Sequence, residues 1–247
     1  MSEEYIIGRN PVLEALRSER EISKIWIAEG SQKGSMQQVI GIAKERNIFV
    51  QLVPRKKIDQ MVEGIHQGVV AHVAAYEYAE LDDLFARAEE RSEPPFFMIL
   101  DEIEDPHNLG SIMRTADAAG AHGIIIPKRR AVGLTATVAK ASTGAIEYIP
   151  VVRVTNVART IEELKERGVW IVGTDATGSD DYRNLDGKMS IGLVIGSEGK
   201  GMGRLIKEKC DFLIRLPMVG KVTSLNASVA ASLLMYEVYR KRNPLGE

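Results

Sequence analysis

Between residues 96 and 247, short hydrophobic runs alternate with stretches whose apolar positions recur at helical spacing. Short apolar runs bounded by polar turns are typical of strands buried on both faces, and the stretches between them of covering helices. The pattern predicts strands over Phe96–Leu100, Gly123–Ile126, Ile149–Val154, Val169–Gly173, Ile191–Ile195 and Phe212–Leu216. It predicts helices over Leu109–Ala119, Leu134–Ala141, Val157–Arg167 and Leu225–Arg242. This alternation favours an α/β domain with a mostly parallel sheet.

A second, shorter α/β pattern occupies residues 1–75. Asn10-Pro11 supplies a good N-cap and first helical residue for a helix that follows. Further helices are predicted over Met36–Arg46 and Pro54–Met61, and strands over Ile22–Ile27, Phe49–Val53 and Val69–Ala75. A pattern of this length is sufficient for a small separate domain.

An acidic segment separates the two patterns. Residues 76–95 contain seven acidic and two basic residues and end with Pro94-Pro95, so their net charge is −5. Residues 1–75 carry +1 and residues 96–247 carry +2. The predicted organisation is a small domain (1–75), an acidic linker (76–95) and a larger domain (96–247). A short amphipathic helix within the linker would fit the helical spacing of Leu81, Leu84, Phe85 and Ala88.

Composition excludes several classes of protein. The chain has 247 residues, 45% of them hydrophobic and 27% charged, and its net charge of −2 does not by itself favour a nucleic-acid partner. The single cysteine, Cys210, excludes an internal disulfide, and the four histidines lack zinc-ligand spacing, so no metal site is expected. The charged N-terminal region and the absence of a long apolar run indicate a cytoplasmic protein with no membrane partner.

Loops that follow the predicted strands carry the candidate chemistry, because ligands bind beyond the carboxyl ends of parallel strands. Asn108 is predicted to cap the helix that begins near Leu109. Arg114 lies six residues later on the same helix and faces a different direction from Asn108. Ser224 is predicted to cap the last helix, which would place Asn226 in its first turn. Residues 196–203 include four glycines but match neither phosphate-binding fingerprint. Each loop alone also fits an ordinary cap, a solvated arginine or a glycine-rich turn.

Together and in order, these loops resemble the three motifs of the SPOUT methyltransferases, specifically the TrmH family of RNA ribose 2′-O-methyltransferases. The matching segments are Asn108-Leu-Gly-Ser-Ile-Met-Arg114, Lys140-Ala-Ser-Thr-Gly-Ala145, Ile195-Gly-Ser-Glu-Gly199, Leu216-Pro-Met218 and Ser224-Leu-Asn-Ala-Ser-Val229. Gly8-Arg-Asn-Pro-Val-Leu-Glu-Ala-Leu16 and His66-Gln-Gly68 resemble the ribosomal-protein-like substrate-binding domain of the RlmB branch. The resemblance implies a deep trefoil knot in residues 96–247, an exception to the general absence of knots.

The resemblance also implies a cofactor, S-adenosylmethionine, and a homodimer that completes the active site. By position, the residues implied to line the cofactor pocket, largely through backbone groups, are Gly173, Thr174, Gly196, Leu216 and Leu225. The implied catalytic set is Asn108, Arg114, Glu198, Ser224 and Asn226.

Methyl transfer to a ribose hydroxyl fits these residue types, since it requires positioning and loss of a proton but no metal. The family pattern points at Arg114 as the general base, although a guanidinium normally stays protonated. Clamping an RNA phosphate and stabilising a developing alkoxide suits an arginine better. Asn108 would then orient this arginine or the ribose, and Glu198 would hold a donor in place.

Local basic clusters are the expected RNA contacts. They comprise Arg9, Arg55, Lys56 and Lys57 in the small domain and Lys128, Arg129 and Arg130 in the larger one. Aromatic residues make up only 6% of the chain, which favours recognition of folded RNA by shape and phosphate over an extended base-stacking platform.

The expected activity is 2′-O-methylation of a guanosine in large-subunit (23S) ribosomal RNA. A transfer RNA target and a non-catalytic RNA-binding ribosome-assembly factor are the alternatives. A dinucleotide-dependent oxidoreductase is disfavoured, because the glycine fingerprint is missing between the first strand and helix.

Overall fold

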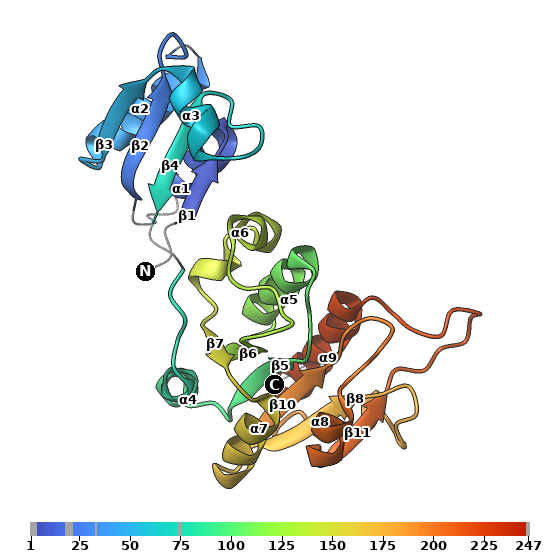
Figure 1. Cartoon of the computed structure of the whole chain (residues 1–247). Helices are drawn as coiled ribbons and strands as arrows, with labels where there is room; N and C mark the ends of the chain where they lie inside the picture. Colours follow the sequence, from blue (N-terminus) through green and yellow to red (C-terminus); the bar gives the residue numbers. More distant parts are fainter. Residues whose placement is uncertain (1–3, 18–21, 33, 74–75, 246–247) are drawn as a thin grey trace. The chain divides into compact units, whose positions relative to one another are not determined.

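The chain forms two compact units, Met1–Glu77 and Tyr78–Glu247, in a computed structural model that describes residues 4–17, 22–32, 34–73 and 76–245 (Figure 1). The first unit is a four-stranded mixed sheet with the strand order β1-β4-β2-β3. Strand β4 is antiparallel to β1 and β2, whereas β2 and β3 are parallel. Its elements are β1 (Glu4–Ile7), α1 (Arg9–Arg17), β2 (Ile22–Ala28), α2 (Ser35–Glu45), β3 (Phe49–Val53), α3 (Arg55–Met61) and β4 (Val69–Val73).

Apolar side chains on the helices and strands build the core of the first unit. Ile58 of α3 is fully buried against Ala28, Val53 and Val70 of the sheet. The three helices and the strands β2, β3 and β4 match the predicted elements. The predicted cap at Asn10 was wrong, because α1 begins at Arg9 and its first helical hydrogen bond runs from the Val12 N–H to the Gly8 carbonyl. Strand β1 was not predicted, and the end of the strand predicted at Val69–Ala75 includes residues 74–75, which lie outside the described residues.

The second unit is built on a sheet of seven strands, all parallel, in the order β7-β6-β5-β10-β8-β11-β9. The strands are β5 (Phe96–Leu100), β6 (Gly123–Pro127), β7 (Val151–Val154), β8 (Trp170–Thr174), β9 (Asp180–Asp181), β10 (Ile191–Ile195) and β11 (Phe212–Arg215). The helices are α4 (Leu81–Glu90), α5 (Pro106–Ala118), α6 (Ala136–Ser142), α7 (Val157–Glu166), α8 (Arg204–Lys209) and α9 (Ala227–Arg242). Short 3₁₀ helices lie at η1 (Ala145–Glu147) and η2 (Tyr182–Asn184). The predicted α/β class with a mostly parallel sheet is confirmed.

Helices cover both faces of this sheet. The central strands β5 and β10 are buried along their whole length. On one face, Leu84 of α4, Ile161 of α7 and Ile206 of α8 share a core with Phe97 and Ile99. Alternate residues of β5 face the opposite side, where α5 and α9 contact each other (Figure 1). This arrangement leaves the loops at the strand ends as the place for a ligand.

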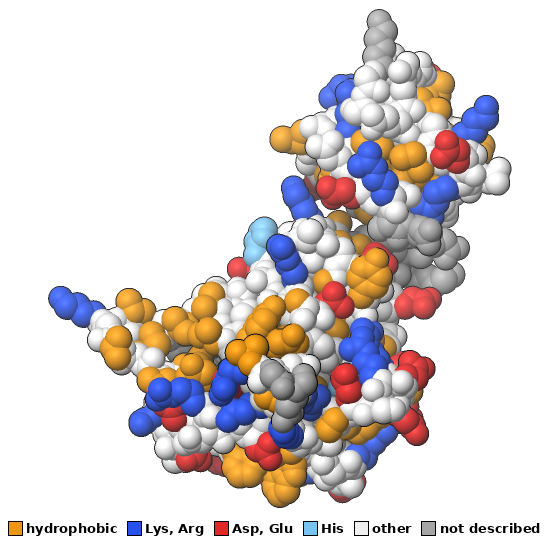
Figure 2. Space-filling model, turned by 180° about the vertical axis from the view of Figure 1, so that it is seen from behind, with side chains coloured by type: hydrophobic (Ala, Val, Ile, Leu, Met, Phe, Trp, Pro, Cys, Tyr) orange, Lys and Arg blue, Asp and Glu red, His pale blue; other side chains and the backbone are white. Residues whose placement is uncertain are grey.

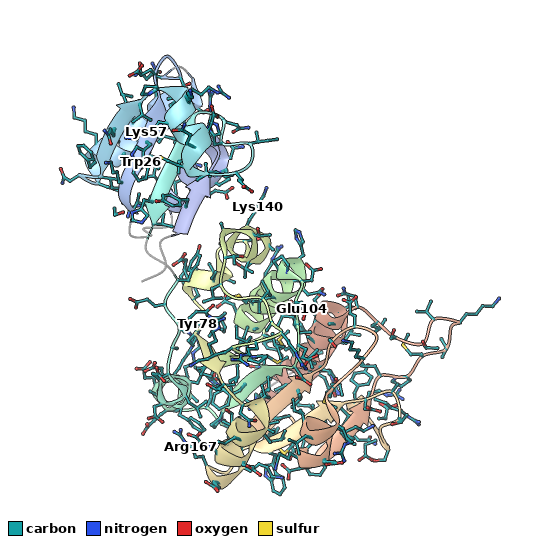
Figure 3. All side chains as sticks on the ribbon, in the orientation of Figure 1. Trp26, Lys57, Tyr78, Glu104, Lys140 and Arg167 are labelled. Atoms are coloured by element: carbon teal, nitrogen blue, oxygen red, sulfur yellow. The ribbon has the colours of Figure 1, made fainter. Side chains whose placement is uncertain are left out.

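The segment 76–95, which the charge count suggests as a linker, is part of the second unit from Tyr78 onward. Leu84 is 0% exposed and Ala88 is 1% exposed, so α4 lies firmly on the sheet. The hydroxyl oxygen of Tyr78 accepts a hydrogen bond of 2.9 Å from the backbone N–H of Leu134 (Figure 3). All seven acidic side chains of the segment are exposed. Four of them lie on the outer face of α4, namely Asp82, Asp83, Glu89 and Glu90, and the other three flank the helix.

Two further findings concern membranes and metals. In the described ranges, the structure contains no helix that is long and apolar enough to cross a membrane. The same residues contain no cluster of three or more histidine, cysteine or acidic side chains that could hold a metal ion.

Candidate active site

The loops that carry the predicted site residues meet at one edge of the second sheet. Because all its strands are parallel, their carboxyl ends lie at the same edge. The loops after β5, β10 and β11 begin at residues 101, 196 and 216, and they reach this edge from distant parts of the sequence.

Asn108 lies inside α5 and does not cap it. Asp105 is the N-cap, its side chain accepts a 2.8 Å hydrogen bond from the N–H of His107, and Pro106 is the first helical residue. The predicted cap at Asn108 was therefore wrong, since Asp105-Pro106 supplies the favoured pair three residues earlier. Asn108 is only 8% exposed, and its amide is free to bind across the site.

The last helix begins at Asn226 rather than at Ser224. The Asn226 Oδ1 atom accepts hydrogen bonds from the backbone N–H groups of Ser228 (2.9 Å) and Val229 (3.3 Å) and from the Ser228 hydroxyl (2.6 Å). The predicted cap at Ser224 was wrong, and this side chain lies exposed in the preceding loop. These three bonds to Oδ1 also orient the Asn226 amide, so that its Nδ2 group faces Glu198.

Glu198 joins its own loop to the starts of α5 and α9 through one carboxylate oxygen. Its Oε1 atom accepts hydrogen bonds from Asn108 Nδ2 (2.8 Å), Asn226 Nδ2 (2.6 Å) and the backbone N–H of Ala227 (3.3 Å). Asn226 Nδ2 also donates to Asn108 Oδ1 at 2.9 Å. Bonds to an ionised acceptor are stronger than neutral ones. The network therefore fixes the start of α9 against the first turn of α5.

The loop that presents Glu198 is itself held tightly. Ser197 and Gly201 exchange two backbone hydrogen bonds, of 3.2 and 2.9 Å. A Cβ atom on Gly196 would lie 2.2 Å from the carbonyl carbon of Gly201, so only glycine fits there. The N–H of Gly203 donates a 2.7 Å hydrogen bond to Oδ2 of Asp101. Burial raises the pKa of the Asp101 carboxyl, and this bond from Gly203 opposes the rise.

A cavity of about 280 Å³ opens beside the network. Glu104, labelled in Figure 3, lies on one wall, and Lys200 is the one basic residue among the described lining residues. The full lining is Glu102, Ile103, Glu104, Asp105, Asn108, Ser197, Glu198 and Lys200. Four acidic residues against one lysine favour a positively charged ligand group over a phosphate.

Four of the five residues implied to hold a cofactor lie at the ends of the neighbouring strands β10, β8 and β11, and the fifth lies just before α9. Gly173 and Thr174 end β8, and the Thr174 hydroxyl donates a 3.1 Å hydrogen bond to the carbonyl of Val194. Leu216 follows β11 and is half-buried, as is Leu225 before α9. Within the described part of the chain, residues 217–225 make no hydrogen bond or ion pair. Their backbone groups are therefore available to a ligand that is bound largely through the main chain.

The structure does not bring every predicted catalytic residue into the network. Arg114 is exposed on α5, and no hydrogen bond or ion pair among the described residues involves its guanidinium. Ser224 also has no hydrogen-bond partner in the described ranges. Both side chains are accessible to a bound molecule.

The predicted RNA-contact residues lie in both units. Lys128, Arg129 and Arg130 follow β6 and are exposed, at the same edge of the sheet as the cavity. Arg130 forms a 3.0 Å ion pair with Glu102 of the cavity wall. In the first unit, Arg9 is half-buried, whereas Arg55 and Lys56 are exposed at the start of α3.

Several residues of the site escaped the sequence reasoning. Asp101, Glu102 and Asp105 follow β5 directly, and Lys200 lies two residues after Glu198. The signal available was a run of acids immediately after a wholly apolar strand, a place where ligand loops are expected.

Each of the two units matches a known protein family. Residues 95–236 match the SpoU rRNA Methylase family, and residues 5–79 match the RNA 2′-O ribose methyltransferase substrate binding family. The chain belongs to the SpoU rRNA methylase family. Its second unit is therefore the SpoU methylase unit, and its first is the substrate-binding unit.

Relatives of this SpoU methylase extend over its whole length. It is 74% identical over 244 residues to YacO, a TrmH family tRNA/rRNA methyltransferase from Bacillus subtilis, which covers 99% of this chain and 98% of that protein. It is 56% identical over 247 residues to a TrmH family tRNA/rRNA methyltransferase from Staphylococcus aureus strain MSSA476, with both chains fully covered.

Two solved structures resemble this SpoU methylase. The SpoU methyltransferase AviRb from Streptomyces viridochromogenes, in complex with the cofactor AdoMet, has a TM-score of 0.74 and 26% identity, covering 97% of this chain and 90% of that one. The AdoMet-bound rRNA methyltransferase from Sinorhizobium meliloti has a TM-score of 0.72 and 29% identity, covering 96% and 87% respectively.

Proposed function

We propose that this S-adenosylmethionine-dependent RNA 2′-O-methyltransferase acts on the ribose of a guanosine in large-subunit ribosomal RNA, as a member of the RlmB branch. The observation that carries the proposal is the network of Asn108, Glu198 and Asn226 beside an acidic cavity. The substrate-binding unit at residues 5–79 and the two AdoMet-bound relatives support the RNA substrate and the cofactor.

S-adenosylmethionine supplies the methyl group when it is bound. The residues that would hold it are Gly173 and Thr174 at the end of β8, Gly196 after β10, Leu216 after β11 and Leu225 before α9. The acidic cavity adjoins this group through Ser197 and Glu198, which directly follow Gly196.

The polar residues position the ribose and assist the loss of the proton from its 2′-hydroxyl. Glu198 fixes the amides of Asn108 and Asn226, so their orientation is set before substrate arrives. Such preorganised polar groups lower the barrier without a reorganisation cost. Arg114 is exposed and unpaired within the described residues, which suits a guanidinium that binds an RNA phosphate and stabilises the developing alkoxide. Ser224 would shape the loop before α9.

A homodimer is part of the proposal. Helix α9 carries exposed apolar side chains at helical spacing, namely Val229, Leu233, Tyr236 and Tyr239. Figure 2 shows hydrophobic side chains gathered on the face of the methylase unit that it presents. Contiguous apolar surface of this kind marks interaction sites on soluble domains. We also propose that residues 96–247 form the knot that the family resemblance implies. Solution scattering tests the dimer, and a strictly monomeric but active protein would contradict it.

The decisive experiment supplies labelled S-adenosylmethionine with ribosomal and transfer RNA from a strain that lacks the enzyme. Labelling of one ribose in large-subunit RNA is expected, and mapping it identifies the nucleotide. The variants Asn108→Ala and Arg114→Ala should lose nearly all turnover while remaining folded. Labelling of transfer RNA alone would favour the second candidate target, which the tRNA/rRNA descriptions of the relatives leave open. Absence of labelling together with firm RNA binding would favour a non-catalytic assembly factor.

A further inference from the structure

The substrate-binding unit contains a polar cavity of about 440 Å³ that the methyl-transfer site does not use. We propose that this cavity holds one unpaired nucleotide of the RNA substrate, with its base inside and its phosphate on the arginines. The inference rests on the proposed function and names how the first unit selects RNA. The residues that line the cavity are Arg9, Asn10, Ser31, Ser35, Arg55 and Gln67.

The chemistry of the lining fits a nucleotide. Two guanidinium groups are present, and every other lining side chain is a hydroxyl or an amide that can both donate and accept hydrogen bonds. None of the described lining residues is acidic, so nothing there opposes a phosphate. Unpaired bases are commonly recognised through hydrogen bonds to their edges and by stacking on arginine planes.

Arg9 is held in place by Gln67. The backbone N–H of Arg9 donates to Gln67 Oε1 at 3.1 Å, and its Nε atom donates to the Gln67 carbonyl at 3.3 Å. These bonds fix the plane of the guanidinium. Its Nη groups make no hydrogen bond within the described part of the chain, so they remain available to a ligand.

The turn that carries Gln67 is built rigidly. Gln67 has a positive φ of 50°. His66 below it is 5% exposed, accepts a 3.1 Å hydrogen bond from the N–H of Gly68 at Nδ1, and contacts Asp59 Oδ1 through Nε2 at 2.7 Å. A Cβ atom on Gly68 would lie 2.8 Å from the Ser31 hydroxyl. Glycine at 68 therefore lets two walls of the cavity approach each other closely.

The volume of the cavity fits a nucleotide better than a lone phosphate. At ~30 Å³ per water molecule in the liquid, the cavity corresponds to roughly 15 waters, far more than the five heavy atoms of a phosphate group. Its volume also lies within the range of ~300–1,000 Å³ that is usual for small-molecule sites. Arg55 is exposed and has no ion pair in the described ranges, so it suits the phosphate, while Asn10, Ser31 and Ser35 suit the base edge.

The test compares two RNA probes on the full-length protein by fluorescence anisotropy at one salt concentration. One probe is an unstructured 12-nucleotide strand of mixed sequence, and the other has the same ribose-phosphate chain without bases. We expect wild type to bind the first about tenfold more tightly, the ratio that corresponds to one base contact of ~1.4 kcal/mol. Gln67→Ala should abolish this ratio, whereas Arg55→Ala should weaken both probes equally.

Two further variants serve as controls for the effect of charge and for the effect of the backbone at position 67. Lys44→Ala removes an exposed cation of α2 outside the cavity and should change neither affinity. Gln67→Asn withdraws the amide while keeping a residue that tolerates the left-handed backbone, and it should also abolish the ratio. Equal binding of both probes by wild type, or an unchanged ratio in folded Gln67→Asn, would overturn the proposal and leave only a phosphate patch.

Failure of the proposed function gives a different result. If wild type transfers no label to any RNA yet keeps a base-dependent affinity that Gln67→Asn removes, the nucleotide site stands and the methyl-transfer assignment fails. If labelling occurs and the two probes bind equally, the assignment stands and the nucleotide site is refuted.

Discussion

Removal of the Glu198 carboxylate tests whether the network sets the geometry of the reaction. Glu198→Ala leaves Nδ2 of Asn108 without its acceptor in a position that is only 8% exposed. An unsatisfied buried donor costs ~1–3 kcal/mol. If the positioned state loses this amount, the rate of methyl transfer should fall by ~5- to 150-fold.

Glu198→Gln should have a smaller effect of the same sign. The amide oxygen can still accept the three bonds, but each changes from a charge-assisted bond, worth ~1.5–3 kcal/mol, to a neutral one, worth ~0.5–1.5 kcal/mol. Solvent screens part of this difference because Glu198 is exposed. Helix α9 should persist in both variants, since Asn226 caps it through Oδ1 and not through Glu198.

The assay is incorporation of labelled methyl groups into ribosomal RNA at saturating cofactor, with cofactor affinity and Tm measured alongside. Glu208→Gln is the matched control, because Glu208 lies in the same unit and accepts a surface hydrogen bond of 2.8 Å from Arg204. The ordering expected is wild type and Glu208→Gln fastest, then Glu198→Gln, then Glu198→Ala. Equal rates in all four proteins would refute the view that Glu198 positions the two asparagines.

Other predictions concern single features of the methylase unit. Gly196→Ala should abolish cofactor binding in titration calorimetry, because backbone atoms of Gly201 and Met202 occupy the site of its Cβ. Burial lowers the pKa of His122 from 6.5 to about 4. As the pH falls below 6.5, the unfolded state therefore binds a proton that the folded state does not. The free energy of unfolding, measured by urea titration, should decrease by roughly 2–3 kcal/mol between pH 6.5 and pH 4.5. His122→Asn, which keeps an acceptor for the Phe96 N–H, should flatten this fall. Burial raises the pKa of Cys210 to about 12, so a thiol reagent at pH 8 should label only unfolded protein.

The elements that sequence predicted well are those whose hydrophobic pattern is strong. Phe96–Leu100 and Ile191–Ile195 were predicted with their observed bounds, because strands buried on both faces need continuous apolar runs. The strand Asp180–Asp181 was missed because it consists of two acidic residues and therefore carries no hydrophobic pattern. The amphipathic helix predicted from the spacing of Leu81, Leu84, Phe85 and Ala88 is present as α4, but the local pattern did not show that its apolar face packs on the second sheet.

The candidate site was predictable as a set of residues but not as a geometry. The motifs identified Asn108, Glu198 and Asn226, yet their contact depends on three parallel strands ending at one edge. The three predicted helix caps, Asn10, Asn108 and Ser224, were misplaced because several residues near each helix start can act as caps, and the local sequence does not decide among them. The hydroxyls at Ser31 and Ser35 carry no sequence signal of their own, since only the folded turns bring them to one cavity.

Charge is distributed in the methylase unit in a way that the net value of −2 conceals. The cavity wall is acidic, whereas the loop after β6 is basic, and the two meet in the ion pair between Arg130 and Glu102. The acidic wall favours a cationic group inside the cavity, and we propose that an RNA phosphate binds outside it, at Lys128 and Arg129. A cationic group and an RNA phosphate would then bind at different places. Because the proposed RNA contacts comprise only a few cations, added salt should weaken RNA binding much more than it weakens cofactor binding, but with a shallow slope.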